Sequence, residues 1–213
     1  MVAAINTKQA AIVTYILETF PSLQLQDTIL ESSVYHPDIP IFEILLKHDP
    51  KIINFEFQDM YTPLIASCRG NNPDFGIYLL ERGADPNIGG MGPWSALYYA
   101  IKCKQPLKLV KKLLDCGANV RDRFALGEAV KSGRVEVLAA FLDAGLDVNV
   151  ADIDGLNETL LHYAVRNEQV EVSRFLLEHG ADQHSLDSTG KSVVEVLGSS
   201  SQQLKDVFGS QAH

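Results

Sequence analysis

Apolar and polar residues alternate along the chain with the spacing of short helices, and the pattern repeats. Four segments end alike, in LLERGADPN, LLDCGANV, FLDAGLDVNV and LLEHGADQH. In each, apolar residues are followed by a glycine, which ends a helix because glycine adopts the left-handed conformation without a steric penalty. The pattern therefore predicts helix ends at Gly83, Gly117, Gly145 and Gly180, roughly 28 to 35 residues apart.

A second recurring element precedes each of these helix ends. The segments TPLIAS, SALYYA, FALGEA and TLLHYA place an apolar anchor residue at Leu64, Leu97, Leu126 and Leu161, and the register extends outward to Leu30 and Val194. Each unit then reads as a short helix, a polar turn and a longer helix. One such hairpin has too little apolar surface to offset its chain entropy, so the hairpins are expected to stack on one another.

These residues resemble the ankyrin repeat, a pattern of roughly 33 residues that runs from Thr-Pro-Leu-His to Gly-Ala-Asp. The pieces that match it best are Thr62-Pro63-Leu64, the run from Thr159 to Ala164, and the Gly-Ala-Asp tripeptides at 83–85 and 180–182. The resemblance covers nearly the whole chain. It implies an all-α fold, an ankyrin-repeat solenoid of stacked helix-turn-helix units joined by hairpin-like fingers.

The register predicts a single ankyrin-repeat domain over residues 1–213. An incomplete N-terminal repeat spans 1–25, full repeats span 26–57, 58–90, 91–121, 122–154 and 155–187, and a C-terminal capping repeat spans 188–213. Because Met1 falls inside what would be the first helix of a repeat, the chain is also open to being a fragment of a larger protein. An exposed apolar face on residues 2–16 would favour that alternative.

Composition and charge limit the cellular compartment and the classes of binding partner that we expect. The chain has 213 residues, of which 46% are apolar and 21% charged, with no apolar run long enough to cross a bilayer. Its first residues show no basic stretch followed by an apolar one, and its three cysteines are odd in number and lack metal-ligand spacing, so we expect an intracellular protein, cytoplasmic or nuclear, that does not bind membranes. Twenty-seven acidic against eighteen basic residues give a net charge of −9, which disfavours non-specific nucleic-acid binding.

The resemblance also implies where binding occurs, because short first helices and fingers line a concave groove in ankyrin-like arrays. Five residues past successive anchors stand Arg69, Lys102, Lys131 and Arg166, a basic ladder suited to an acidic segment of a protein partner. The same four residues fall near the ends of short helices, where a cation interacts favourably with the helix dipole. The ladder thus has a structural explanation beside the functional one.

Two further positions in each unit are expected to face the groove. The residue three positions before each anchor differs from repeat to repeat, as expected of a surface fitted to one irregular partner. The residue two positions past the anchor is a tyrosine in two of the repeats, and tyrosine is common at binding interfaces. Trp94 lies in a glycine-rich segment, from which we expect partial exposure. The candidate partner-binding residues are Tyr61, Arg69, Trp94, Tyr99, Lys102, Arg123, Glu128, Lys131, Glu158, Tyr163 and Arg166.

The chain contains no catalytic motif of the common kinds, so the sequence leaves enzymatic activity open without supporting it. We expect no cofactor and no metal, a structural role for His162, and the most exposed cysteine at Cys116. The leading hypothesis is a non-catalytic protein–protein interaction module, or scaffold, that holds a partner segment in the groove. The alternative is a small-molecule-binding protein or atypical enzyme with a pocket formed by the irregular fingers around residues 120–158. The oligomeric state is not decided by the sequence.

Overall fold

A computed structural model describes residues 1–58, 61–70, 72–89, 94–151, 157–198 and 200–209. The chain divides into two compact units, an N-terminal unit over Met1–Ala118 and a C-terminal unit over Asn119–His213. The prediction that all repeats form one domain stays a prediction.

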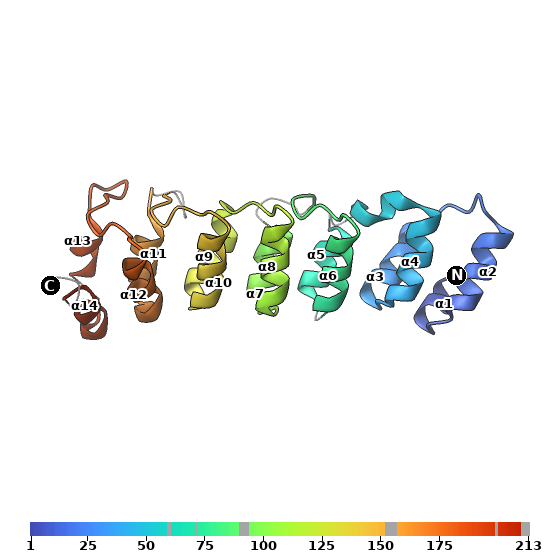
Figure 1. Cartoon of the computed structure of the whole chain (residues 1–213), viewed down its shortest axis with the longest axis horizontal. Coiled ribbons are helices and arrows are strands. Elements are labelled where there is room, and N and C mark those ends of the chain that lie inside the picture. Colours follow the sequence, from blue (N-terminus) through green and yellow to red (C-terminus); the bar gives the residue numbers. More distant parts are fainter. Residues whose placement is uncertain (59–60, 71, 90–93, 152–156, 199, 210–213) are drawn as a thin grey trace. The chain divides into compact units, whose positions relative to one another are not determined.

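The N-terminal unit is built of four helical hairpins (Figure 1). The first helices of the hairpins are α1 (Val2–Asn6), α3 (Asp27–Tyr35), α5 (Pro63–Arg69) and α7 (Ala96–Lys102). The second helices are α2 (Ala10–Thr19), α4 (Ile39–His48), α6 (Pro73–Glu81) and α8 (Leu107–Asp115), and the 3-10 helix η1 (Pro50–Asn54) follows α4.

The C-terminal unit repeats the same arrangement in three hairpins. Its first helices are α9 (Arg123–Lys131), α11 (Leu160–Arg166) and α13 (Val193–Leu197), and its second helices are α10 (Val135–Asp143), α12 (Val170–Glu178) and α14 (Gln202–Gly209). Among the described residues no β-strand forms, and Leu186 pairs with Ser192 only as an isolated bridge. The all-α fold class is thereby confirmed.

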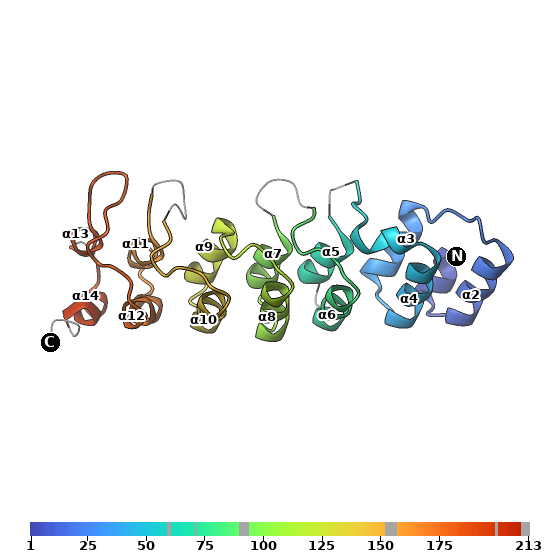
Figure 2. The ribbon, with the colours of Figure 1, turned by 45° about the horizontal axis from the view of Figure 1, so that its top comes forward.

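Within each unit the helices lie in two layers. The first helices pack side by side, α3 against α5 and α5 against α7 in one unit and α9 against α11 and α11 against α13 in the other. The second helices form the other layer, and Figure 2 shows the connecting segments projecting beyond the ends of the helices. This layering places the first helices and the fingers together on one face of each unit.

The anchor residues of the central repeats and the helix ends behave as the sequence predicts. The extension of the register to Val194 is wrong, because Val194 is 43% exposed and the preceding residue, Val193, is buried in its place. Leu64, Leu97 and Leu126 are each 1% exposed and Leu161 is fully buried. The glycines that end the second helices all have positive φ angles, 89° at Gly83, 88° at Gly117, 92° at Gly145 and 88° at Gly180. The anchors therefore form the interior between hairpins, and the glycines turn the chain out of each second helix.

Polar side chains join successive hairpins at the ends of their helices. Gln105 Nε2 donates to the backbone carbonyls of Cys68 and Gly70, at 3.0 and 2.8 Å, and so caps the end of α5 from the following hairpin. Gln169 Nε2 does the same for the carbonyl of Lys131 at the end of α9, at 3.1 Å. These bonds satisfy carbonyls that have no partner within their own helix.

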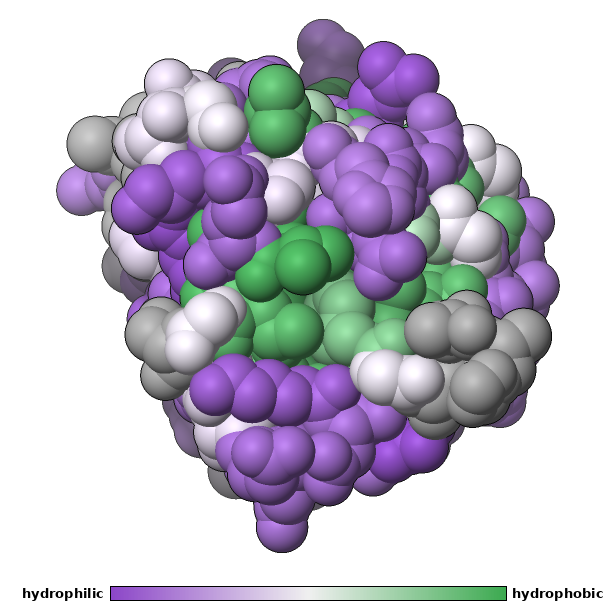
Figure 3. Space-filling model, turned by 90° about the vertical axis from the view of Figure 1, so that its left-hand side faces the viewer, coloured by the Kyte–Doolittle hydropathy of each residue, from purple (hydrophilic) through white to green (hydrophobic). Residues whose placement is uncertain are grey.

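Both ends of the chain expose some apolar surface. In the first hairpin Ile12 and Tyr15 are exposed. In the last one Leu204, Val207 and Phe208 of α14 are buried, whereas Val194 of α13 is exposed. Figure 3 views this end and shows an apolar area ringed by polar side chains. Among the described residues, no helix is long and apolar enough to span a lipid bilayer.

Candidate functional site

Five of the candidate residues gather on one surface of the N-terminal unit, which we name the α5–α7 surface. Tyr61 and Trp94 come just before α5 and α7, Tyr99 lies within α7, and Arg69 and Lys102 are the last residues of α5 and α7. Thr62 and Ser95 fix the starts of these helices, since their hydroxyls accept hydrogen bonds from the backbone amides of the third helical residues. The surface is thus held by two well-capped, adjacent helices.

Arg69 lies over two tyrosine rings on this surface. Its Cζ is 4.3 Å from the ring centre of Tyr61 and 5.4 Å from that of Tyr99, and the two tyrosine hydroxyl oxygens are 2.8 Å apart. The Arg69 side chain is exposed, and among the described residues no carboxylate lies within ion-pair distance of it. Arg69 therefore makes cation–π contacts with both rings.

The Tyr99 hydroxyl beneath Arg69 stays protonated over the physiological pH range. Burial raises the pKa of Tyr99 to about 12, and the hydrogen bond with Tyr61 adds to the shift. The positive charge of Arg69 opposes both effects. The Tyr99 ring therefore stays neutral and does not cancel the charge of Arg69.

Lys102 occupies a similar place on the aromatic residues of α7. Its Nζ is 5.4 Å from the ring centre of Trp94 and 5.2 Å from that of Tyr98, and it donates a hydrogen bond of 2.8 Å to the Tyr98 hydroxyl. Trp94 is half-buried, as expected, with its ring centre 5.0 Å from that of Tyr98. The glycines at 90 and 92 near it lie outside the described residues.

An open hollow of about 470 Å³ adjoins this surface at Arg69. It is lined by Tyr35, Ala66, Arg69 and Gly70, and the Tyr35 ring is 52% exposed. Tyr35 ends α3 just as Arg69 ends α5, so a tyrosine and an arginine occupy equivalent positions in neighbouring hairpins. A hollow with one exposed aromatic wall and one cation is suited to a side chain that is partly apolar and negatively charged at its end.

The candidates of the C-terminal unit are more dispersed. Lys131 ends α9 with its Nζ 5.5 Å from the ring centre of Tyr163 on α11. Arg123 begins α9 and lies over the ring of Phe124, with its Cζ 4.7 Å from the ring centre. Glu128 is half-buried on α9. Lys131 and Tyr163 thus repeat the cation-on-ring arrangement, whereas Arg123 contacts its own neighbour in sequence.

Glu158 and Arg166 differ from what their positions in the repeat led us to expect. Glu158 is fully buried rather than exposed, and its carboxylate forms an ion pair with Arg166 Nε. Arg166 Nη2 also contacts Asp187 Oδ2 at 3.0 Å. The expectation of an exposed Glu158 is therefore wrong, because a buried carboxylate requires a cation, and Arg166 supplies it. Two acids balance the charge of Arg166, whereas among the described residues no acid forms an ion pair with Arg69.

Asp187 organises the finger that leads into α13. Its Oδ1 accepts hydrogen bonds from the Thr189 hydroxyl and from the backbone amides of Thr189 and Lys191, at 2.7, 2.8 and 3.1 Å. These bonds, the Thr189 hydroxyl foremost, hold the pKa of Asp187 well below its usual range. Neither Asp187 nor Tyr98 was among the sequence candidates. The Tyr98–Lys102 spacing of four residues and the Asp-x-x-Gly turn at 187–190 are the signals that identify them.

All four ladder residues are the last residues of their helices, α5, α7, α9 and α11. The helix-dipole explanation of their positions therefore stands beside the functional one. His162 is buried, exchanges hydrogen bonds with Thr159 at the start of α11, and has its pKa lowered by burial, as a structural residue would.

Cysteine exposure differs from the expectation. Cys103 is exposed and Cys116 is only half-buried, because Cys103 lies in the turn that follows α7. Among the described residues no three histidine, cysteine or acidic side chains are grouped so as to hold a metal ion. Residues 152–156, in the irregular finger for which the alternative hypothesis proposes a pocket, lie outside the described residues.

Comparison with known proteins identifies a matching family and several similar proteins. A family model of three ankyrin repeats matches residues 97–187, and a model of a single ankyrin repeat matches residues 59–90. The ankyrin repeat protein FPV223 of fowlpox virus is 32% identical over 103 residues, which cover 47% of this chain and 71% of that protein.

Two longer relatives match as well. The ankyrin repeat protein L371 of Acanthamoeba polyphaga mimivirus is 23% identical over 205 residues, 90% of this chain and 26% of that protein. An L-asparaginase of Dirofilaria immitis is 31% identical over 115 residues, 52% of this chain and 19% of that protein. The chain thus spans about a quarter or less of the length of these two relatives.

Proposed function

The chain belongs to the ankyrin-repeat family, and from this premise we propose that it is a non-catalytic interaction module, or scaffold, that binds a segment of a protein partner. Ankyrin repeats generally mediate protein–protein interaction. The partner segment lies along the face formed by the first helices and the fingers. The proposal places the protein in a reducing, intracellular compartment, in keeping with its three free cysteines.

The observation that carries this proposal is the position of Arg69 on Tyr61 and Tyr99. An arginine stacked on rings has lost part of its side-chain freedom before a partner arrives, so binding costs less entropy. Tyrosine, tryptophan and arginine are the residue types that supply most binding energy at protein interfaces. The α5–α7 surface holds all three types, and two cations on it favour an acidic segment over a basic one.

In the C-terminal unit the proposal includes Arg123, Glu128, Lys131, Tyr163 and Arg166 and leaves out Glu158, whose side chain has no exposed surface. Because the whole chain carries a charge of −9, long polyanions are repelled at a distance, and only a short acidic stretch aligned with the local cations gains. Nucleic acids are therefore not proposed as partners. The match to the L-asparaginase covers too little of that protein to support a proposal of amide hydrolysis.

A panel of defined peptides tests the proposal. Fluorescence anisotropy of labelled peptides that alternate glutamate with aromatic residues, measured at low and moderate salt, should detect saturable, salt-sensitive binding. The double variant Arg69→Glu and Lys102→Glu should bind at least about tenfold more weakly, since each exposed charge pair contributes up to ~1 kcal/mol and its reversal adds repulsion.

The matched control is the double variant Lys108→Glu and Lys111→Glu. It changes the net charge by the same amount on exposed residues of α8, in the other helix layer. If both double variants lose the same affinity, net charge and not the α5–α7 surface governs binding. If neither loses affinity, the surface has no part in it.

A further inference from the structure

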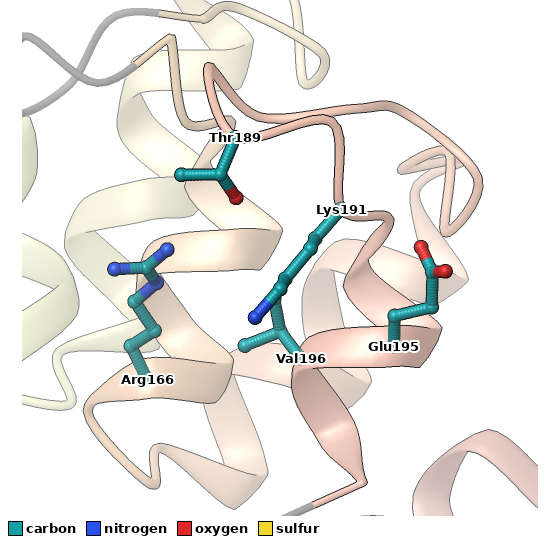
Figure 4. Close-up of a pocket in the computed structure, with 5 residues that line it drawn as sticks. All are labelled: Arg166, Thr189, Lys191, Glu195 and Val196. Atoms are coloured by element: carbon teal, nitrogen blue, oxygen red, sulfur yellow. The ribbon is translucent and has the colours of Figure 1, made fainter.

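The C-terminal unit contains an open hollow that the family's repeat pattern does not account for. It has a volume of about 380 Å³ and is lined by Arg166 at the end of α11, Thr189 and Lys191 in the finger before α13, and Glu195 and Val196 in α13 (Figure 4). Its size is near the lower end of the range for ligand sites, about 300 Å³, which suits a single side chain or a small acid.

Arg166 is held firmly at one side of this hollow. Its Nε and Nη2 are engaged by Glu158 and Asp187, whose side chains are both fully buried. The Arg166 side chain itself is 38% exposed, and its Nη1 has no partner among the described residues. Two buried acids thus fix the orientation of one guanidinium, and one of its nitrogens remains available to a ligand.

Lys191 lies on the other side, on a backbone that is itself fixed. Its amide donates to Asp187 Oδ1 at 3.1 Å, and its carbonyl accepts from the amide of Asp187 at 2.9 Å. Figure 4 shows the Lys191 ammonium directed toward Arg166, whereas the Glu195 carboxylate points away from both. No described residue forms an ion pair with the Lys191 ammonium.

We infer that this hollow is a carboxylate-binding site, in which the ligand lies between the Lys191 ammonium and Arg166 Nη1 and rests against Val196. The charge balance selects the class of ligand. The Arg166 and Lys191 cations face two buried acids, Glu158 and Asp187. The Glu195 carboxylate also lines the hollow and accepts hydrogen bonds from Ser192, so three acids stand against two cations. Each negative charge on a ligand therefore adds repulsion, and a singly charged carboxylate is favoured over a doubly charged phosphate.

The carboxylate has two possible sources, an acidic side chain of a peptide segment and a free carboxylic acid. The site differs from the α5–α7 surface and lies in the other unit. It shares Arg166 with the proposed function but depends on Lys191, which that proposal does not include. It stands even if the α5–α7 surface binds nothing. Failure of one and failure of the other are therefore separate results.

Titrations of the isotope-labelled full chain, followed by its amide resonances, test the site. The probes are glutarate, the blocked tripeptide acetyl-Gly-Glu-Gly-amide, its glutamine counterpart, and inorganic phosphate. We expect glutarate and the glutamate peptide to shift the amides of residues 187–196 to saturation, and the glutamine peptide to leave them in place. Peptide binding without glutarate binding identifies a peptide as the source, whereas equal affinities show that a free acid is sufficient.

Variants of Lys191 assign the binding to the hollow. Lys191→Gln should weaken the carboxylate affinity about fivefold, as removal of one exposed charge pair does, and Lys191→Arg should retain it. Lys205→Gln in α14 is the matched control and should have no effect. Arg69→Glu, which tests the proposed function, should also have none.

Three results would overturn the inference. The first is the absence of saturable shifts at 187–196 with either carboxylate, and the second is an unchanged affinity in Lys191→Gln. The third is tighter binding of phosphate than of glutarate, because it contradicts the charge balance from which the ligand class was argued.

Discussion

Replacement of Arg166 by methionine is the sharpest test of the way the C-terminal unit handles buried charge. Methionine keeps much of the length of the side chain and removes the guanidinium, so the Glu158 carboxylate, fully buried, would lose the cation beside it, and Asp187 would lose one of its partners. Leaving a buried charge without its partner costs about 3–5 kcal/mol. Because the Arg166 side chain is 38% exposed and water reaches it, we take the lower end, about 3 kcal/mol.

Urea unfolding at neutral pH, followed by circular dichroism, measures this cost. With a denaturant dependence of about 2 kcal/mol/M, a loss of about 3 kcal/mol moves the unfolding midpoint of the C-terminal unit down by roughly 1.5 M. The control is Arg174→Met on α12, whose ion pair with Glu171 is exposed on both sides, and it should cost less than about 0.5 kcal/mol.

The double variant with Glu158→Gln completes the argument. If the cost of Arg166→Met comes from the stranded Glu158 carboxylate, Glu158→Gln should return at least about 1.5 kcal/mol when added to Arg166→Met, while destabilising the native background. Strictly additive effects would refute the reasoning. They would mean that Arg166 contributes by packing and not by compensating a buried charge.

Three further predictions concern single positions. The pKa of Asp187 is lower in the folded state than in the unfolded chain, so its contribution to stability is fully present above about pH 4 and is lost progressively as the pH falls toward the folded-state pKa; Asp187→Asn should lower the urea midpoint at pH 7, and its difference from the native chain should shrink steadily as the pH falls from about 4 toward about 2. Burial raises the pKa of Cys68 to about 12, so a thiol reagent at pH 8 should label Cys103 within minutes and Cys68 only after unfolding, as mass spectrometry of quenched samples will show. Gly83→Ala should cost about 1 kcal/mol in thermal or urea unfolding, because the φ angle of 89° is strained for alanine while no atom lies within 4 Å of the added methyl group.

The sequence predicts the repeat well because the repeat depends on local chemistry. Leu64 and Leu161 are buried where their register places them, and Gly83 and Gly180 end helices with positive φ, since apolar periodicity and a glycine stop act within a few residues. The positions of Arg69 and Lys102 at helix ends follow from the same counting.

The ion-pair partners of the buried acids could not be predicted from local sequence patterns. Glu158 occupies the same place in its repeat as Tyr61 and Trp94, and nothing local distinguishes a partly exposed residue from a buried one. Its burial depends on Arg166 and on Asp187, which belongs to the next finger and lies twenty-one residues past Arg166. Tyr35 stands five residues past Leu30, just as Arg69 stands five residues past Leu64. Its place on the same surface could therefore be predicted from the repeat register, but only if aromatic residues as well as cations are considered at that position.

The glutamines that cap a neighbour's helix have a consequence for how the protein comes apart. Gln105 binds the last carbonyls of α5, and Gln169 binds the last carbonyl of α9, so the hydrogen bonding of one hairpin is completed by the hairpin after it. When the later hairpin melts, it uncovers those carbonyls and loosens the helix before it. Opening is then directional at these two places: melting of the hairpin that carries Gln105 or Gln169 loosens the hairpin before it, so hydrogen exchange at the ends of α5 and α9 should speed up when the following hairpin is destabilised.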